Sequence, residues 1–254
     1  MTNNARTGTM TSDWLHNLTP ETRRPRLRLL CLPCAGGAVS GYRSWRVSVP
    51  DDVELIVAQL PGRERRMAEP ACTDARTIVT ALRTALHTLP SAPLALFGHS
   101  LGGSLAHLLA IELTAMAQPP AVLAVAGRSA PRHAKFRPSL NRLDDSQLLA
   151  ALSRMGGTPA AVLEHQDLMA MLLPILRTDL AVGENIAIPD QPRLSCPVLA
   201  LAGDADSFAP ADEVQAWHET THGPFHFATM AGGHFFPAAH CRPIIELIRR
   251  TAGV

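Results

Sequence analysis

A short stretch in the first half of the chain, from Leu94 to Gly103, joins two segments of different hydrophobic periodicity through a sharp turn. Leu94 to Phe97 is an unbroken apolar run, typical of a buried parallel strand, and from Ser104 to Met116 apolar residues recur at helical spacing. Between them, Gly98-His-Ser-Leu-Gly102 matches G-x-S-x-G. Glycines on both sides of Ser100 remove Cβ atoms that would collide in so tight a turn. The stretch predicts an exposed, nucleophilic serine at a helix N-terminus; the alternative is a purely structural turn.

Strand and helix patterns alternate along the rest of the chain. Further strands are predicted over 27–32, 53–59, 121–127, 197–202 and 225–230, and helices over 74–89, 210–220 and 243–251. This alternation predicts an α/β fold in which a mostly parallel central sheet has helices on both faces. A chain of 254 residues, 46% of them hydrophobic, is long enough to bury one such core as a single domain.

Two segments depart from this alternation. Residues 1–25 are polar, and we expect them to form a mobile arm in front of a domain that spans 26–254. Residues 132–192 predict two or three amphipathic helices, over 144–155, 160–173 and 175–182, with Pro174 breaking or kinking the second from the third. A helical insertion at about 132–192, between two sheet strands, is expected to form a lid over the carboxyl edge of the sheet.

Composition excludes several classes of function. The 23 basic and 22 acidic residues give a net charge of +1, so we expect no nucleic-acid partner and no membrane surface. No apolar segment is long enough to span a bilayer, and the first residues lack a secretory h-region. The odd count of five cysteines indicates a reducing cytoplasm. Cys31 and Cys34 form C-x-x-C without a second pair, so neither a metal site nor a redox site is expected.

A serine nucleophile needs a base that removes its proton and a third group that orients the base. Of the eleven histidines, His234 follows the 225–230 strand and two glycines, where a loop reaches inward from the sheet edge. We therefore expect His234 to be the base. His99 adjoins the serine, but its side chain is expected to point away. Three other histidines occupy helical patterns in which surface positions are expected, namely His87, His107 and His240.

Two carboxylates follow the 197–202 strand and are candidates for the orienting acid. Asp206 lies further out on the loop and is better placed to reach the histidine, whereas Asp204 is the alternative or caps a turn. The expected donors to a tetrahedral oxyanion are the backbone N–H groups of Leu101, at the helix start, and of Ala35. Ala35 lies in a loop of small residues whose backbone can approach a ligand closely.

Several motifs of the chain carry a resemblance to a known family, and two of them, Pro61-Gly-Arg-Glu64 and Gly232-Gly-His-Phe-Phe236, are far more specific than G-x-S-x-G. They are Cys31-Leu-Pro-Cys-Ala-Gly-Gly37, Gln59-Leu-Pro-Gly-Arg-Glu-Arg65, Gly98-His-Ser-Leu-Gly-Gly103, Arg177-Thr-Asp179, Gly203-Asp-Ala-Asp206 and Gly232-Gly-His-Phe-Phe236. In these motifs the chain resembles the stand-alone type II thioesterases of polyketide and nonribosomal peptide biosynthesis, which belong to the α/β-hydrolase superfamily. The catalytic serine, aspartate and histidine of that family fall on Ser100, Asp206 and His234.

The resemblance implies an editing enzyme of antibiotic biosynthesis. Such an enzyme hydrolyses acyl groups from the phosphopantetheine thiol of an acyl or peptidyl carrier protein, which it meets in trans. It needs no metal or cofactor, and we expect a monomer. The alternative is a carboxylesterase or an acyltransferase that acts on free small acyl substrates. A protein of this fold that only binds its ligand is a third hypothesis.

The candidate contacts to the acyl chain or the carrier are Cys34, Arg63, Met155, Met169 and Phe235. Cys34 and Asn185 stand where the family usually has other, larger side chains, so we expect a reshaped acyl pocket. Arg63, Arg65 and Arg66 form a basic cluster. The cluster is expected either to contact the acidic carrier or the pantetheine phosphate, or to be a solvated loop with salt bridges.

Overall fold

The computed structural model describes residues 10–19, 25–134, 139–158, 160–186 and 193–254. Its strands form one sheet in the order β1-β2-β4-β3-β5-β6-β7-β8. The strands are β1 (Met10–Ser12), β2 (Leu15–Asn17), β3 (Leu27–Leu32), β4 (Val53–Ala58), β5 (Leu94–His99), β6 (Val122–Ala126), β7 (Val198–Gly203) and β8 (Phe225–Met230). The six strands from β3 to β8 pair in parallel, as the alternation of elements predicts.

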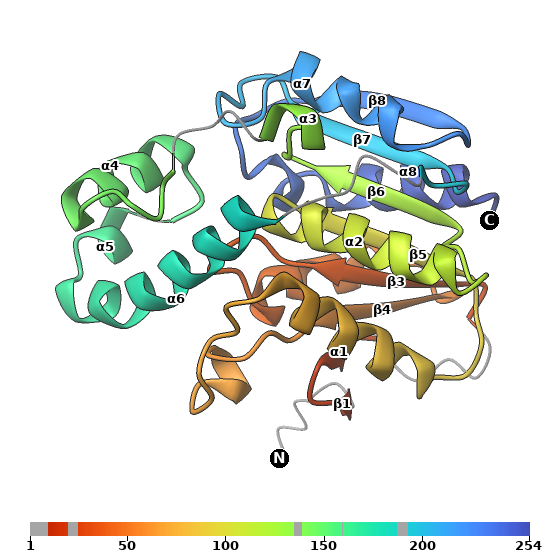
Figure 1. Ribbon diagram of the computed structural model, residues 1–254, viewed down its shortest axis with the longest axis horizontal. Coiled ribbons are helices and arrows are strands. Elements are labelled where there is room, and N and C mark those ends of the chain that lie inside the picture. Colours follow the sequence, from red (N-terminus) through yellow and green to blue (C-terminus); the bar gives the residue numbers. More distant parts are fainter. Residues whose placement is uncertain (1–9, 20–24, 135–138, 159, 187–192) are drawn as a thin grey trace.

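Helices cover both faces of the sheet (Figure 1). The α-helices are α1 (Ala75–His87), α2 (Leu101–Ala115), α3 (Pro131–Ala134), α4 (Asp145–Met155), α5 (Ala160–Leu163), α6 (Gln166–Asn185), α7 (Ala211–Gln215) and α8 (Cys241–Ala252). Short 3-10 helices are η1 (Val39–Val47), η2 (Glu64–Arg66), η3 (Ala216–Thr220) and η4 (Phe236–Ala238). No helix in the described ranges is both long enough and apolar enough to cross a lipid bilayer.

The sheet separates two hydrophobic clusters, one on each face. Leu30 and Leu32 of β3 pack with α1 and α2, while Leu29 and Cys31 of the same strand pack with η1 and α8. Successive side chains of a strand point to opposite faces, so a strand buried on both sides is expected to be apolar on both. This explains why β6 and β7 are continuous apolar runs, whereas β3 and β4 each carry one buried charge, Arg28 and Glu54, and these two charges pair with each other.

The expectation of a mobile arm over residues 1–25 is wrong for residues 10–17. These residues form β1 and β2, and β2 pairs antiparallel with β4 at the edge of the sheet. Leu15 is fully buried, and the Arg66 guanidinium lies 4.3 Å from the centre of the Trp14 ring. Burial of Leu15, which contributes about 2 kcal/mol, acts together with the pairing of β2 with β4 and the hydrogen bond from Asn17 to Glu54 to dock this segment. Residues 1–9 and 20–24 lie outside the described ranges.

The insertion between β6 and β7 contains helices α3 to α6. Leu148 of α4 and Met169 and Leu173 of α6 form a small separate core. Figure 1 shows α4 and α5 standing clear of the sheet, with α6 running back toward α2. The predicted break at Pro174 is wrong, because α6 continues through it, and the preceding helix ends near residue 163 instead. A proline removes one backbone hydrogen bond, which packing on both sides can compensate.

Candidate active site

The turn at Ser100 is as tight as its sequence predicts. Ser100 has φ 54° and ψ −115°, a strained conformation, and it directly precedes α2. A Cβ atom on Gly98 would lie 2.1 Å from the carbonyl oxygen of Gly102, and one on Gly102 would lie 2.0 Å from that of Leu32. Both positions therefore require glycine. The serine side chain is left half-buried at the carboxyl edge of the sheet.

Three side chains meet at this edge from three separate loops. Nε2 of His234 lies 3.1 Å from Oγ of Ser100, and Nδ1 of His234 lies 2.9 Å from Oδ2 of Asp206. Asp206 follows β7 and His234 follows β8, and both are buried. With Asp206 ionised, Nδ1–H of the imidazole donates to the carboxylate, which leaves Nε2 free to accept the serine proton.

The environment of Asp206 favours its ionised form. Its other oxygen, Oδ1, accepts backbone N–H bonds from Phe208 at 2.8 Å and Ala209 at 3.1 Å. Burial acts to raise the pKa of Asp206, but the hydrogen bonds from His234 and from these two amides outweigh it and lower the pKa below its ordinary value. The carboxylate is thus held in place and charged next to the imidazole.

Asp204, the other candidate, faces away from this group. It is exposed, and its Oδ1 accepts a hydrogen bond from the backbone N–H of Gly232 at 2.8 Å. It therefore ties the loop after β7 to the loop after β8, which corresponds to the turn-capping alternative.

The His99 side chain, which we expected to point away from Ser100, has recorded contacts with His234 and Phe235. Its Nε2 lies 2.8 Å from the backbone carbonyl oxygen of His234, and the two rings are 5.2 Å apart. Burial, together with the nearby His234, lowers the pKa of His99 to about 3. A neutral imidazole in this position donates Nε2–H to the carbonyl, so His99 supports the backbone of the histidine that contacts the serine. Its place at the end of a buried strand was the available signal in the sequence.

The expectation of surface histidines holds for His87, which is exposed, but it is wrong for His107. His107 is buried on α2 and packs edge-on against Trp217, with 5.0 Å between ring centres. Burial lowers its pKa to about 4. His240 is half-buried, and its Nε2 lies 2.9 Å from the carbonyl oxygen of Ala231.

Ser100 and His234 line a cavity of about 350 Å³, which Ala35 and Leu101 also line. Within the described ranges, no protein acceptor is recorded for the backbone N–H of either Ala35 or Leu101. The following N–H, that of Gly36, donates instead to Asp179. Ala35 and Leu101 therefore line the cavity of Ser100 with backbone N–H groups for which the described residues provide no recorded acceptor. Part of the lining comes from the insertion and includes Met155, Asp179 and Asn185.

A second cavity, of about 410 Å³, shares Ala35 with the first. Its lining includes the other three apolar candidates, Cys34, Met169 and Phe235, together with Tyr42 and Trp45 of η1. Burial raises the pKa of the Cys34 thiol to about 11, so this side chain is a small apolar group and not a nucleophile. All five cysteines are free thiols.

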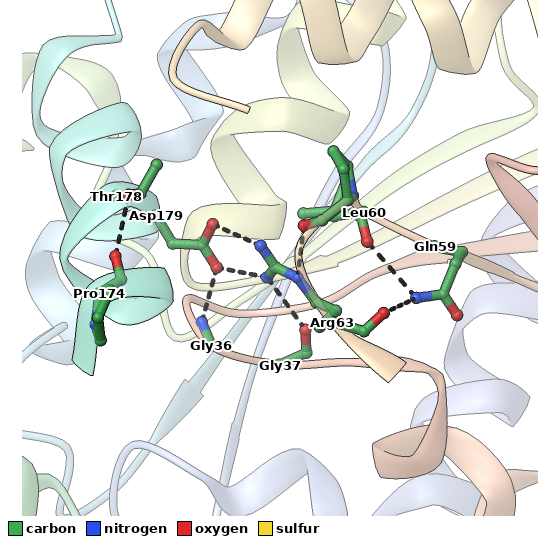
Figure 2. A network of polar contacts seen from close by, with 9 residues as sticks. Gly36, Gly37, Gln59, Leu60, Arg63, Pro174, Thr178 and Asp179 are labelled. Carbon is green, nitrogen blue, oxygen red and sulfur yellow. Dashed lines mark hydrogen bonds and ion pairs between the residues drawn. The ribbon is translucent and has the colours of Figure 1, made fainter. Parts of the chain in front are cut away.

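Arg63 is not the open cation that the basic cluster suggested. Its side chain is only 6% exposed and forms a two-pronged ion pair with Asp179, at 2.5 and 2.9 Å (Figure 2). Its guanidinium is thus paired with Asp179, and Arg63 also lies in the lining of the second cavity. Arg66 pairs with Glu69 at 2.6 Å, whereas Arg65 is exposed. Of the two hypotheses for the basic cluster, the loop with salt bridges therefore applies to Arg66.

A mostly parallel sheet whose strand-end loops bring together serine, histidine and aspartate side chains defines an α/β-hydrolase. Residues 27–251 match the family model described as "Thioesterase domain". The chain is 36% identical to thioesterase PikA5 of Streptomyces venezuelae over 225 residues, which cover 88% of this chain and 79% of that protein. Another relative, a probable cadicidin biosynthesis thioesterase of Streptomyces griseus, is longer, and the match covers 62% of it.

Solved structures agree with this family. The type II thioesterase BorB, from the borrelidin biosynthetic cluster, has a TM-score of 0.87 and 32% identity, covering 96% of this chain and 99% of BorB. YbtT, a type II thioesterase of the yersiniabactin NRPS/PKS pathway, has a TM-score of 0.86 and 28% identity, covering 94% and 98%. The chain belongs to the Thioesterase domain family, whose members are hydrolases that act on thioesters.

Proposed function

We propose that this chain is an editing thioesterase that removes acyl groups from the phosphopantetheine arm of acyl or peptidyl carrier proteins. The observation that supports this best is the chain of hydrogen bonds from Ser100 through His234 to Asp206, at the wall of a cavity, in a member of this family. Ser100 is the nucleophile, His234 the base and Asp206 the orienting acid. Ala35 and Leu101 supply the oxyanion donors.

Acylation starts with attack of Ser100 Oγ on the thioester carbonyl carbon, while Nε2 of His234 takes the hydroxyl proton. Asp206 keeps Nδ1 protonated and stabilises the imidazolium. The carbonyl oxygen becomes an oxyanion that accepts hydrogen bonds from the backbone N–H groups of Ala35 and Leu101. As the tetrahedral intermediate collapses, the C–S bond breaks and the pantetheine sulfur leaves with the proton from His234. The acyl group is then an ester of Ser100.

Deacylation repeats these steps with water. His234 removes a proton from a water molecule as it attacks the ester, and the same two N–H groups stabilise the second oxyanion. Collapse returns the proton to Ser100 Oγ and releases a carboxylic acid. This sequence uses protein groups and water.

The relatives support a carrier-bound substrate. YbtT is by its description a type II thioesterase of an NRPS/PKS pathway, and BorB one from a biosynthetic cluster. By analogy, this chain acts as a monomer and meets the carrier protein in trans. Helices α4 to α6 then act as a lid over the acyl group. The apolar lining by Met155, Met169 and Phe235 suits an acyl chain. A cytoplasmic location remains a prediction; free thiols at all five cysteines agree with it.

The test compares acyl carriers with free esters. Purified protein is given acyl groups on a holo carrier protein, the same acyl groups on N-acetylcysteamine, and p-nitrophenyl esters, and products are read by mass spectrometry. We expect kcat/KM to be highest for the carrier and Ser100→Ala to abolish turnover and labelling by a fluorophosphonate probe. A clear preference for free esters would favour the carboxylesterase, and acyl transfer to added alcohols or amines would favour the acyltransferase.

A further inference from the structure

Asp179 of α6 holds the loop that contains Ala35. Its Oδ2 accepts the backbone N–H of Gly36 at 2.8 Å, so the hydrogen bond is made at the residue next to the proposed oxyanion donor (Figure 2). Gly36 has φ 69°, a conformation that leaves this N–H turned toward the helix. Asp179 is only 2% exposed. Its carboxylate already accepts hydrogen bonds from protein groups, so its burial at this position does not require a contact with substrate.

Arg63 holds that carboxylate in turn. Its Nη1 and Nη2 reach Oδ2 and Oδ1 of Asp179 at 2.5 and 2.9 Å. The same guanidinium donates to the carbonyl oxygens of Pro61 at 3.2 Å and Gly37 at 3.4 Å. Arg63 therefore joins three segments, namely the loop after β4, the loop after β3 and helix α6. A bidentate guanidinium–carboxylate pair fixes orientation as well as distance.

The same face of α6 also touches the second donor. Gly183 lies one helical turn beyond Asp179, and a Cβ atom on it would lie 3.2 Å from Cδ1 of Leu101. Leu176, nearly one turn before Asp179, packs against Gly36, where a Cβ atom would lie 3.4 Å from Cδ1 of Leu176. One helix of the insertion thus contacts the segments that contain both proposed oxyanion donors.

We propose that Asp179, oriented by Arg63, is a positioning residue that sets the Ala35 N–H relative to Leu101, and that the second half of α6 is a fixed part of the oxyanion hole. The inference rests on the proposed function, because it assumes that Ala35 and Leu101 stabilise the oxyanion. It assigns to helix α6 of the insertion the positioning of the oxyanion donors, in addition to covering the acyl group as a lid. Donors must be in place before charge develops, since a small displacement weakens their effect on the transition state.

The decisive variant removes the ion pair without leaving a buried charge. Asp179→Leu alone would strand the Arg63 cation in the interior and destabilise the fold, whereas the double variant Arg63→Met/Asp179→Leu replaces both groups by apolar ones. For the double variant we expect kcat on a butyryl-N-acetylcysteamine thioester to fall about 10- to 100-fold, with KM changed less than about threefold. Asp179→Asn retains one acceptor but opposes an NH₂ group to the guanidinium, so we expect an intermediate loss, of about threefold or more.

A second buried pair offers a matched control. Nε of Arg28 lies 2.5 Å from Oε2 of Glu54, both side chains are nearly as buried, and the pair lies at the opposite end of β3 and β4. Arg28→Met/Glu54→Leu should change thermal stability to a similar extent and leave kcat of the folded enzyme unchanged.

The affinity for an alkyl trifluoromethyl ketone separates positioning from a general structural role. This inhibitor adds to the serine and places an oxyanion between the two donors, so its affinity should fall in parallel with kcat, while that of the matching methyl ketone should not. The inference would be overturned if the folded double variant had the kcat of the wild type, or if its kcat/KM fell only because KM rose. If the double variant does not fold, wild-type kcat in Asp179→Asn overturns it instead. All values are ratios to wild type on one small thioester, so a lack of preference for carriers would refute the proposed function and not this inference.

Discussion

Nε2 of His99 lies 2.8 Å from the backbone carbonyl oxygen of His234, so the residue before the serine supports the residue that contacts the serine. The two imidazoles have different roles in the structure. His234 connects Ser100 to Asp206, whereas His99 is buried, neutral and bonded to backbone. The first prediction follows from this contact.

We expect His99→Phe to lower kcat about tenfold and to leave KM nearly unchanged. Phenylalanine fills a similar volume but has no donor, so the His234 carbonyl loses its partner and the loop can shift; leaving a buried acceptor unpaired costs about 1–3 kcal/mol. Steady-state kinetics and thermal unfolding measure the two effects. His107→Phe is the control, because that ring is also buried but packs against Trp217, and it should keep wild-type kcat.

Both buried histidines should make the protein sensitive to acid. The pKa of His99 is lowered to about 3 and that of His107 to about 4, from 6.5. Below pH 6.5 the unfolded chain therefore binds more protons at these two histidines than the folded protein does. The unfolding free energy is thus unaffected by them above pH 6.5 and decreases as the pH falls toward 4 and 3. The loss by pH 4 is of the order of 5 kcal/mol for the two together.

Urea unfolding at several pH values measures this dependence. His107→Phe should reduce the slope of the unfolding free energy against pH in that window, because it removes one titrating group and preserves volume. An unchanged slope would mean that His107 is accessible to protons in the folded protein.

Asp206 and Asp204 should differ sharply on conversion to asparagine. Asp206→Asn removes the charge that stabilises the imidazolium and presents an amide to Nδ1, so we expect kcat to fall about 10³- to 10⁴-fold. Asp204→Asn keeps an oxygen that can accept the Gly232 N–H, so activity should stay within about twofold of wild type. Turnover numbers in the reverse order would assign the orienting role to Asp204.

The glycines of the serine turn should not tolerate a methyl group. In Gly98→Ala the new Cβ atom would lie 2.1 Å from the carbonyl oxygen of Gly102, which is backbone and cannot move without opening the turn. We expect a loss of more than about 3 kcal/mol of unfolding free energy, or no folded protein. Gly41→Ala is the control, since no atom lies within 4 Å of its Cβ position and its φ is ordinary; it should be neutral or slightly stabilising.

Hydrogen exchange should divide the insertion into two parts. Helices α4 and α5 pack on a small core with α6, so we expect fast exchange there. The second half of α6, which contains Asp179 and Gly183, is held against Gly36 and Leu101, so its amides should exchange more slowly and closer to the rate of the sheet. Equal protection across α4, α5 and all of α6 would contradict both the lid and the fixed second half.

Local patterns in the sequence were enough to predict the parallel sheet, the serine turn and the loops on which Asp206 and His234 lie. The reason is that periodicity and glycine placement act over a few residues. A strand buried on both faces is mostly apolar, and a turn with φ 54° at Ser100 needs glycines beside it. The motifs around these residues also identified the family.

Long-range packing decided the rest. The pairing of Arg63 with Asp179 joins residues 116 positions apart, and neither residue shows in its own surroundings that it is buried. Pro174 did not end its helix, and Leu15 joined a polar segment to the sheet, because tertiary contacts outweighed local preference. The sequence by itself determined which candidate groups lie on the strand-end loops, whereas only the tertiary structure decided what holds them, since buried charges find their partners by packing and not by spacing along the chain.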